Sequence, residues 1–361
     1  MAAVSDLAEQ DPMPPLGLAV IGCGGITRSA HLPAIAALGD RLRLVATVDI
    51  DLAAAARAAA PFGARAFADA DAAIDDPSVE AVLIATPEDS HAALTLAAVA
   101  AGKHVLCEKP IAPTLEEADR MIAGAEAAGV VFMVAHSRRF TRRYMEVERL
   151  LRAGRIGRLR LVRENERRPR GFGPGGERSF RPDHWTGDPA RCAGIALLAG
   201  IHEADVLCWL AGQTPLAVQA HHAVTTPGNA GVPDFLSFTL RFPDGAIGAS
   251  EIARMLPPGY PTVHQLELYG TGGTLHARDS DGAGLVRHDE GGARQPSSIA
   301  LNLSGGRTYA RQLASFVAAI RQGVAPPVTA RAARLALAVA LATIEAAESG
   351  RSVAIDPAVM P

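Results

Sequence analysis

The sequence contains few aromatic residues and few cysteines. Aromatic side chains account for 4% of the 361 residues, and none of the four cysteines stands in a C-x-x-C pair. The histidines also lack the spacing of metal ligands, so we predict no metal site. We expect free, buried thiols of the kind found in cytoplasmic proteins. The scarcity of aromatic side chains also argues against the stacking platforms that bind single-stranded nucleic acid.

An excess of one charge and long apolar stretches are lacking as well. The formal net charge is −3, which gives no general attraction to nucleic acid or membrane surfaces. Apolar helical stretches such as residues 335–344 are far shorter than the roughly 20 residues that cross a bilayer. Residues 1–15 lack the basic and apolar regions of a signal peptide. We expect a cytoplasmic protein with a disordered tail over residues 1–15 and without nucleic-acid or membrane partners.

Apolar residues are abundant, at 48% of a chain whose length allows about two domains. From residue 16 to about residue 136, short apolar strand patterns alternate with helical patterns. This alternation predicts an α/β fold with a doubly wound parallel sheet. Ligands bind such sheets beyond the carboxyl ends of the strands. Those ends fall at residues 22–25, 49, 85–87, 107–110 and 135–137.

After residue 137 the pattern changes to helices and hairpins. A helical pattern covers residues 195–210, and the turn Pro243-Asp244-Gly245 separates two strand patterns. Residues 279–300 are rich in loop-forming side chains, and two closing helices are expected at 309–321 and 330–349. We therefore predict a second, α+β domain over residues 138–361 with a mostly antiparallel sheet.

Thirteen arginines lie between positions 138 and 170, interleaved with glutamates. We interpret this stretch as a solvated helix and strand joined by ion pairs. The alternative is a surface for an anionic substrate or partner.

The most informative stretch is the strand, turn and helix pattern over residues 16–31. An apolar strand is followed at once by Gly22, Gly24 and Gly25 and then by a helix, a layout that directs helix N–H groups at a phosphate. Thr27 stands where a third glycine is usual, and its hydroxyl could donate to a phosphate. Asp49 follows the second strand and is placed to accept from ribose hydroxyls. The alternative is a surface turn with an incidental aspartate.

These positions predict a bound dinucleotide. A carboxylate at Asp49 repels a 2′-phosphate and favours NAD, although NADP stays open, and Arg57 lies too far along the next helix to argue strongly for NADP. Thr86, Pro87 and His91 could line the nicotinamide ribose, although His91 could equally be a plain helix-terminal polar residue. The predicted cofactor contacts are Gly22, Gly24, Gly25, Ile26, Thr27, Asp49, Thr86, Pro87, His91, Glu108 and Lys109.

Two further groups carry acid–base chemistry. Lys109 follows a strand end within Glu108-Lys109-Pro110, where the proline forces a turn and a cis peptide bond is one expectation. The alternative is a solvent-exposed turn lysine. His202 and Asp205 are three residues apart and share one face of a helix. A histidine near neutral pH can take the proton of a hydroxyl group, although a lone helical histidine can also be structural.

Together these stretches resemble the glucose–fructose oxidoreductase, inositol dehydrogenase and rhizopine catabolism (Gfo/Idh/MocA) family of oxidoreductases. The resemblance covers nearly the whole chain, and Glu-Lys-Pro followed by Gly-x-His-x-x-Asp is a specific combination. The segments that carry it are residues 20–26, 31–33, 85–87, 90–91, 101–110, 139–140, 194–205, 209–212 and 269–273.

The resemblance implies a Rossmann domain over residues 16–137 and, over residues 138–361, a substrate domain with a large open sheet. It implies NAD(P)-dependent hydride transfer to or from a sugar, cyclitol or polyol-like substrate, and a homodimer or homotetramer formed through that sheet. Lys109 and His202 would lie nearest the hydride-transfer centre, with the reactive ring turned towards an amine from one half of the molecule and an imidazole from the other. The implied substrate contacts are Asp205, Trp185 and Arg139.

One position departs from the family pattern. Many members carry an aspartate four residues before the histidine, and this chain has Leu198 there. Either Lys109 and His202 suffice, or another residue replaces the acid; the candidates are Tyr144, Asp183 and His184. Two other functions stay open, a relative that retains NAD during glycoside cleavage or epimerisation, and a dinucleotide-binding protein without turnover.

Overall fold

The computed structural model describes residues 14–170, 182, 186, 188, 194–226, 229, 231–257, 260, 262–278, 285–289, 292–294 and 306–356. The chain divides into two compact units. The first consists of Met1–Glu108, Ala123–Met133 and Gly305–Pro327, and the second of Lys109–Ile122, Val134–Ser304 and Val328–Pro361. Within the described ranges, every helix is too short or too polar to span a membrane.

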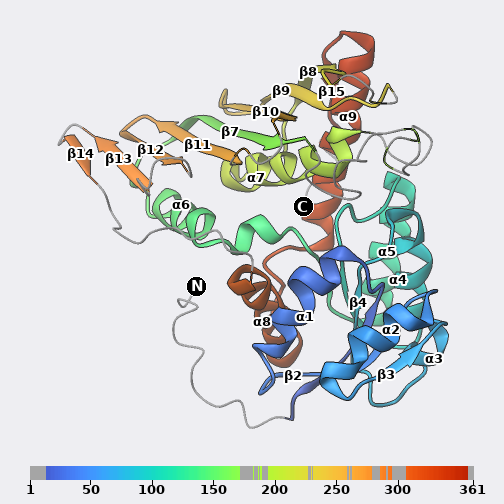
Figure 1. Ribbon diagram of the computed structural model, residues 1–361. Coiled ribbons are helices and arrows are strands. Elements are labelled where there is room, and N and C mark those ends of the chain that lie inside the picture. The colour runs from blue at the N-terminus through green and yellow to red at the C-terminus, as the bar shows by residue number, and fades with distance from the viewer. Residues whose placement is uncertain are drawn as a thin grey trace. The chain divides into compact units, whose positions relative to one another are not determined.

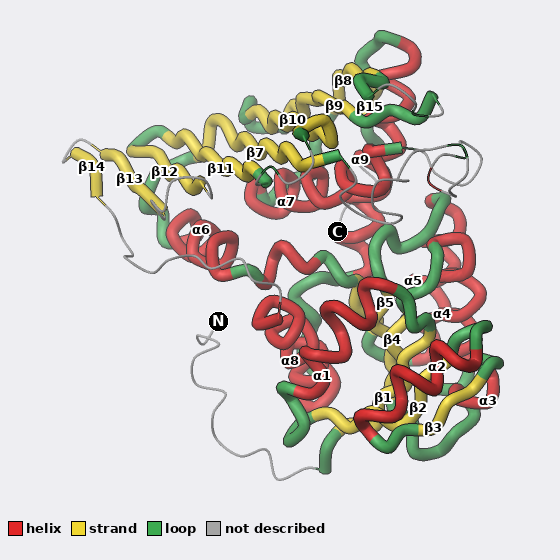
Figure 2. Tube along the Cα trace, in the orientation of Figure 1, coloured by secondary structure: helices red, strands yellow, loops and turns green. Residues whose placement is uncertain are grey.

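The first unit is built on a parallel sheet (Figure 2). Among the described residues it has six strands in the order β3-β2-β1-β4-β5-β6, and β1 pairs in parallel with both β2 and β4. This order confirms the predicted doubly wound sheet. The order in which successive strands are added reverses beside β1, while the strands stay parallel. The strands are β1 (Leu16–Ile21), β2 (Leu42–Val48), β3 (Arg65–Phe67), β4 (Ala81–Ile84), β5 (His104–Cys107) and β6 (Phe132–Val134).

Helices follow the strands of this sheet. Every residue of β1 and of β4 is buried. Strands that are covered on both faces have continuous apolar sequences, as these two do. The helices are α1 (Leu32–Ala36), α2 (Leu52–Ala59), α3 (Asp71–Ile74), α4 (His91–Ala100), α5 (Leu115–Ala128), which has residues in both units, and α8 (Gly306–Gln322).

The second unit is built on a mostly antiparallel sheet, as predicted (Figure 1). Its described strands follow the order β14-β13-β12-β11-β7-β10-β9-β8-β15, and β7 and β10 are paired in parallel. The strands are β7 (Leu159–Pro169), β8 (Ala217–Ala223), β9 (Phe235–Arg241), β10 (Ile247–Leu256), β11 (Val263–Gly270), β12 (Gly273–Arg278), β13 (Leu285–Asp289), β14 (Gly292–Arg294) and β15 (Val353–Ala354). The helices are α6 (Arg142–Arg152), α7 (Ile201–Ala211) and α9 (Ala330–Ser349).

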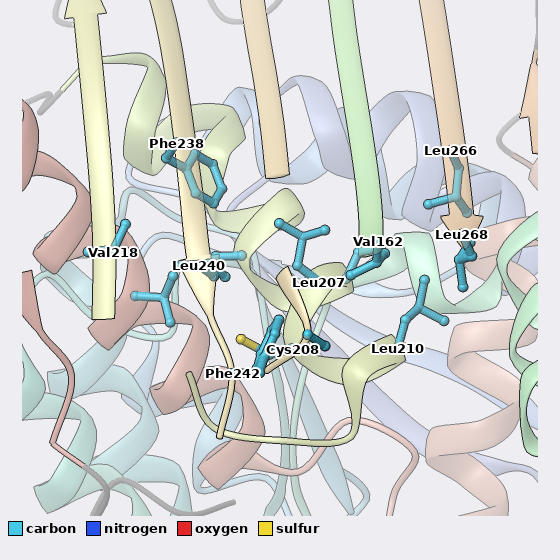
Figure 3. Packing of buried hydrophobic residues seen from close by; sticks show 14 of the residues in the cluster. Val162, Leu207, Cys208, Leu210, Val218, Phe238, Leu240, Phe242, Leu266 and Leu268 are labelled. Carbon is cyan, nitrogen blue, oxygen red and sulfur yellow. The ribbon is translucent and has the colours of Figure 1, made fainter. Parts of the chain in front are cut away.

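The core of the second unit lies between its sheet and helix α7 (Figure 3). Leu207 and Leu210 of α7 belong to one buried cluster with Val162 of β7 and Leu240 of β9. Residues alternate between the two faces of β7, so that Val162 is buried while its neighbour Arg163 is exposed. The apolar alternation therefore fixes which face of the sheet packs against α7.

Two expectations differ from the structure. Residues 285–289 and 292–294, expected within a loop-rich stretch, extend the sheet as β13 and β14. Antiparallel pairing of β13 with β12 and of β14 with β13 supplies hydrogen bonds that local sequence does not reveal. The helix after the glycine turn begins as a π-helical turn over Thr27–His31 before α1. Free, buried thiols are confirmed for Cys23, Cys107 and Cys208. Cys192 and the predicted tail up to residue 13 lie outside the described residues.

Candidate active site

The glycine turn follows β1 and lies against the loop after β4. Gly22 has a φ of +94°, and a Cβ atom there would lie 2.5 Å from the carbonyl oxygen of Ala85. Only glycine fits both the conformation and the space. By contrast, a Cβ atom on Gly24 or Gly25 would meet no described atom within 4 Å. The turn therefore combines a tightly packed base with an open outer side, which fits the close approach of a pyrophosphate.

Thr27 closes this turn from within. Its side chain is fully buried, and its hydroxyl donates to the carbonyl of Gly22 at 2.6 Å. The prediction that this hydroxyl donates to a phosphate is therefore wrong, because its proton already has a buried acceptor in the turn. Ile26, next to it, is 37% exposed.

Asp49 follows β2 and holds the glycine turn in place. One carboxylate oxygen accepts from the backbone N–H of Cys23 at 2.8 Å, and the other accepts from the N–H of Asp51 at 2.9 Å. Each carboxylate oxygen can accept a further hydrogen bond. Asp49 is half-exposed, so this remaining capacity suits ribose hydroxyls.

The loop after β4 brings together three other predicted cofactor contacts. The Thr86 hydroxyl oxygen accepts from the hydroxyl of Ser90 at 2.7 Å. His91 begins α4, is buried, and donates from Nε2 to the carbonyl of Thr86 at 3.1 Å. Pro87 lies between them and is exposed. The observed bonds of His91 thus shape the loop, and its predicted contact with the ribose stays a prediction.

Glu108 has a buried partner of its own. Its carboxylate accepts from Nε2 of His31 at 2.9 Å, and the ring of Tyr309 from α8 packs edge-on against His31 with centroids 5.0 Å apart. This pair links the π-helical turn after the glycines to the carboxyl end of β5. The predicted contact of Glu108 with the cofactor stays a prediction.

Lys109 is the first residue of the second unit, and its peptide bond with Pro110 is cis, as expected. Its ammonium group donates to the backbone carbonyl of Leu198 at 3.1 Å. Leu198 lies in a second π-helical turn, Ala196–Gly200, which leads directly into α7. π-Helical turns displace backbone carbonyls from their usual partners and often mark functional stretches. At the position where an acid was missing, the main chain therefore provides an acceptor for Lys109.

His202 lies near Lys109 at the start of α7. Burial, followed by the positive charges of Lys109 and Arg138, lowers the pKa of His202 well below its ordinary value. The imidazole is therefore neutral at physiological pH and able to accept a proton. The ring of His136, which follows β6, lies edge-on with centroids 6.3 Å apart. Two of the predicted catalytic groups, one ammonium and one neutral imidazole, thus occur in the same part of the second unit.

Asp205 lies one turn further along α7 and is paired with Arg139. The guanidinium donates from Nε to one carboxylate oxygen at 2.9 Å and from Nη2 to the other at 2.5 Å. Burial alone would raise the pKa of Asp205, but the positive charge of Arg139 holds it below its ordinary value. Arg139 also lies over the ring of Trp209, at 5.2 Å. Two predicted substrate contacts therefore contact each other; Trp185, Asp183 and His184 lie outside the described residues.

A buried charge cluster beside α7 was not predicted. Arg138 lies 2.5 Å from carboxylate oxygens of both Glu164 and Glu166 and 2.7 Å from one of Glu203. Tyr144, a predicted substitute for the missing acid, is fully buried and donates to Glu164. The interpretation of residues 138–170 as solvated ion pairs is therefore wrong for these residues. It holds for α6, whose exposed Arg149 pairs with Glu146.

The sequence carried a signal for this cluster. Glu164 and Glu166 alternate in step with the apolar Val162, so strand periodicity places all three on the buried face. Glu203 is an acid in a helical stretch whose other residues, apart from His202 and Asp205, are apolar. Buried acids require a partner, but the sequence does not show which of the thirteen arginines between positions 138 and 170 provides it.

Comparison with known proteins agrees with this arrangement. Residues 16–136 match the model of an oxidoreductase family with an NAD-binding Rossmann fold, and residues 144–276 match the Gfo/Idh/MocA C-terminal domain. The chain is 31% identical over 353 residues to inositol 2-dehydrogenase 2 of Saccharopolyspora erythraea, covering 96% of this chain and 97% of that one. The chain belongs to the Gfo/Idh/MocA family of oxidoreductases.

Two other members of the family are similar over most of their length. Myo-inositol 2-dehydrogenase of Thermotoga maritima is 29% identical over 296 residues, 81% of this chain and 84% of that one. The structure of levoglucosan dehydrogenase in complex with NADH and L-sorbose superposes with a TM-score of 0.83 at 25% identity, covering 95% of this chain and 99% of that one. The similarity therefore extends through both units of this Gfo/Idh/MocA protein.

The glycine turn yields a paired prediction. We expect Gly24→Ala to leave the melting temperature unchanged, because its methyl group enters open space, yet to weaken NADH binding roughly tenfold or more by blocking the close approach of the pyrophosphate. Gly22→Ala should lower the melting temperature, because it strains the backbone and meets Ala85. Calorimetry and fluorescence titration with NADH measure both effects. Equal behaviour of the two variants would contradict this account of the turn.

Glu203 yields a prediction about stability and pH. Burial raises its pKa from 4.5 to about 8, so the folded protein retains a proton that the unfolded chain releases between these values. This stabilising contribution is fully present below the unfolded pKa and is lost as the pH rises through the folded one. The melting temperature of the wild type should therefore fall relative to that of Glu203→Gln between about pH 5 and pH 8. A difference that does not change with pH would contradict the raised pKa.

Proposed function

We propose that the protein catalyses reversible hydride transfer between NAD and a hydroxyl-bearing carbon of a sugar, cyclitol or polyol-like molecule. The observation that carries the proposal is the joint placement of Lys109 and the neutral His202 at the Ala196–Gly200 turn. Relatives named inositol 2-dehydrogenase and levoglucosan dehydrogenase support this substrate class.

The first unit provides the cofactor-binding residues. Gly24 and Gly25 leave open space for the pyrophosphate, and the Asp49 carboxylate can accept from the adenosine ribose, which favours NAD because it would repel a 2′-phosphate. When bound, the dinucleotide supplies the hydride acceptor at its nicotinamide ring. Lys109 follows the carboxyl end of β5 by two residues in the sequence.

The second unit provides the acid–base residues. In the direction of oxidation, the neutral imidazole of His202 accepts the hydroxyl proton while the ammonium of Lys109 donates a hydrogen bond to the same oxygen. Negative charge develops on that oxygen as its proton leaves, and a cation nearby stabilises it. Asp205, kept ionised by Arg139, accepts from another substrate hydroxyl. In the direction of reduction, protonated His202 returns the proton.

This mechanism does not need an aspartate at position 198. At this position the main-chain carbonyl of Leu198 accepts from the ammonium group of Lys109 at 3.1 Å. A carbonyl carries no net charge, so Lys109 keeps its full positive charge for the substrate oxygen. The leucine therefore does not favour a protein without turnover.

The assay is a panel of inositols, sugars, anhydrosugars and sugar acids with NAD and NADP, read at the nicotinamide absorbance. NAD reduction with at least one polyol or sugar supports the proposal. Turnover of a substrate without net NADH production would instead indicate the relative that retains its cofactor. Binding of NADH without turnover of any panel member would contradict the enzymatic proposal.

The two proposed catalytic residues yield a kinetic prediction. We expect His202→Asn and Lys109→Met each to lower kcat for the panel substrate by roughly 10²–10⁴-fold, the usual contribution of acid–base groups. For His202→Asn, the NADH dissociation constant should stay close to that of the wild type. His221→Asn, which changes an exposed histidine on β8, serves as the matched control. Wild-type turnover by His202→Asn would remove His202 from the mechanism.

The lowered pKa of His202 yields a pH prediction. The base works only when its imidazole is neutral, so the rate of oxidation should fall as the pH drops through the pKa of His202. That pKa lies well below its usual value. As the pH is lowered, kcat/KM for oxidation should therefore stay constant past the ordinary histidine pKa of about 6.5, and it should decline only at a clearly lower pH. An acid limb centred at or above about pH 6.5 would contradict this role.

We also propose that the protein forms a homodimer or homotetramer through the sheet of its second unit. The sheet face that carries exposed Arg163 and half-buried Arg167 bears paired charges of both signs, with Arg163 near Glu267 at 3.5 Å and Arg167 paired with Glu251. Such a polar face can meet its own copy without a net repulsion. A monomer in light scattering at assay concentrations would exclude this assembly.

A further inference from the structure

One turn of the chain contacts α7 at two residues that follow His202, namely Glu203 and Asp205. The turn Ser137–Phe140 carries two consecutive arginines. Arg138 lies 2.7 Å from Glu203, the residue directly after His202, and Arg139 binds Asp205 through two hydrogen bonds. Arg139 therefore holds Asp205 by hydrogen bonds, and Arg138 lies at ion-pair distance from Glu203, in the helical turn that carries the proposed base.

Arg138 also ties this helical turn to the sheet. Its two Nη atoms each lie 2.5 Å from a carboxylate of β7, Nη1 from Glu164 and Nη2 from Glu166. These two carboxylates also have other partners, from α6, β11 and β7 itself. The partners are Tyr144 of α6 on Glu164, and His264 of β11 and Arg168 of β7 on Glu166. A single buried guanidinium group thus connects α7 to strand β7, whose glutamates are also held by other side chains.

The imidazole of His202 has little support of its own. Among the described residues, its Nδ1 atom is buried and has no hydrogen-bond partner. A catalytic histidine is usually oriented by a hydrogen bond to its second ring nitrogen. Here the direction of the ring must instead follow from the position of the α7 backbone and from packing.

We propose that Arg138, acting through Glu203, is a positioning residue that sets the location of the His202 imidazole. The inference rests on the proposed function, in which His202 is the base. Displacement of a reacting group by about 1 Å can cost on the order of 100-fold in rate. The contact between Arg138 and Glu203, here called the clamp, lies one residue from His202 and can therefore affect the rate. Arg138 itself lies among carboxylates and acts without touching the substrate.

Glu203 is the position at which the clamp can be tested. Removal of Arg138 would leave three buried carboxylates without their shared cation, which would be strongly destabilising. Glu203→Met removes one carboxylate at nearly constant volume and leaves Arg138 with Glu164 and Glu166. Glu203→Gln keeps the shape and an oxygen that can accept from Arg138. It also resembles the protonated form that a raised pKa favours near neutral pH.

The experiment compares kcat, substrate KM and the NADH dissociation constant for both variants. We expect Glu203→Met to lower kcat roughly 10–100-fold, with KM and NADH binding within about twofold of the wild type. Glu203→Gln should recover to within about threefold of the wild-type kcat. The matched control is Glu146→Gln, which removes a carboxylate from the exposed pair with Arg149 on α6.

Each outcome decides for or against the clamp. A folded Glu203→Met protein with wild-type kcat overturns the inference, as does an equal loss in Met and Gln variants. If Glu203→Met does not fold, Arg138→Lys is measured by the same criteria, because a lysine cannot contact all three carboxylates at once. Loss of activity in His202→Asn together with an unimpaired Glu203→Met overturns only the clamp. Wild-type activity in His202→Asn overturns the proposed function.

Discussion

The second unit depends on a buried cluster of three acids that surrounds one guanidinium group. Glu164, Glu166 and Glu203 are almost completely inaccessible to water, and Arg138 contacts all three. Transfer of several charges out of water is costly, and the cost is recovered only when the partners are close and well oriented. The strand β7 and the helix α7 are therefore held at a fixed distance by the contacts of Arg138 with these acids, in addition to apolar packing.

The same neighbourhood explains why the imidazole of His202 is neutral. Burial disfavours its charged form, and the cations that serve other purposes, Lys109 and Arg138, disfavour it further. Asp205 experiences the opposite effect, because Arg139 stabilises its charged form. A histidine ready to accept a proton and an aspartate that stays ionised thus arise on one helix, three residues apart, from burial and the placement of neighbouring cations.

Much of this molecule was predictable from the sequence because periodicity and turn chemistry are local. The parallel sheet followed from alternating strands and helices, and Gly22 followed from a conformation that only glycine adopts without strain. Long-range pairing was not predictable in this way. The hydroxyl of Thr27 has its acceptor five residues back along the chain, but the partners of Arg138 lie 26, 28 and 65 positions away, and only the fold brings them together. The strand β14 was missed for the same reason, since its pairing with β13 outweighs its weak local preference.

The acceptor for Lys109 belongs to the main chain, and this has a consequence for the evolution of specificity. A carbonyl oxygen is supplied by any amino acid, so exchange of the side chain at position 198 leaves that acceptor in place as long as the π-helical turn persists. An enzyme that holds its lysine in this way can vary a residue four positions before its histidine without dismantling the reaction centre. Position 198 is thereby a natural starting point for saturation libraries that seek new alcohols.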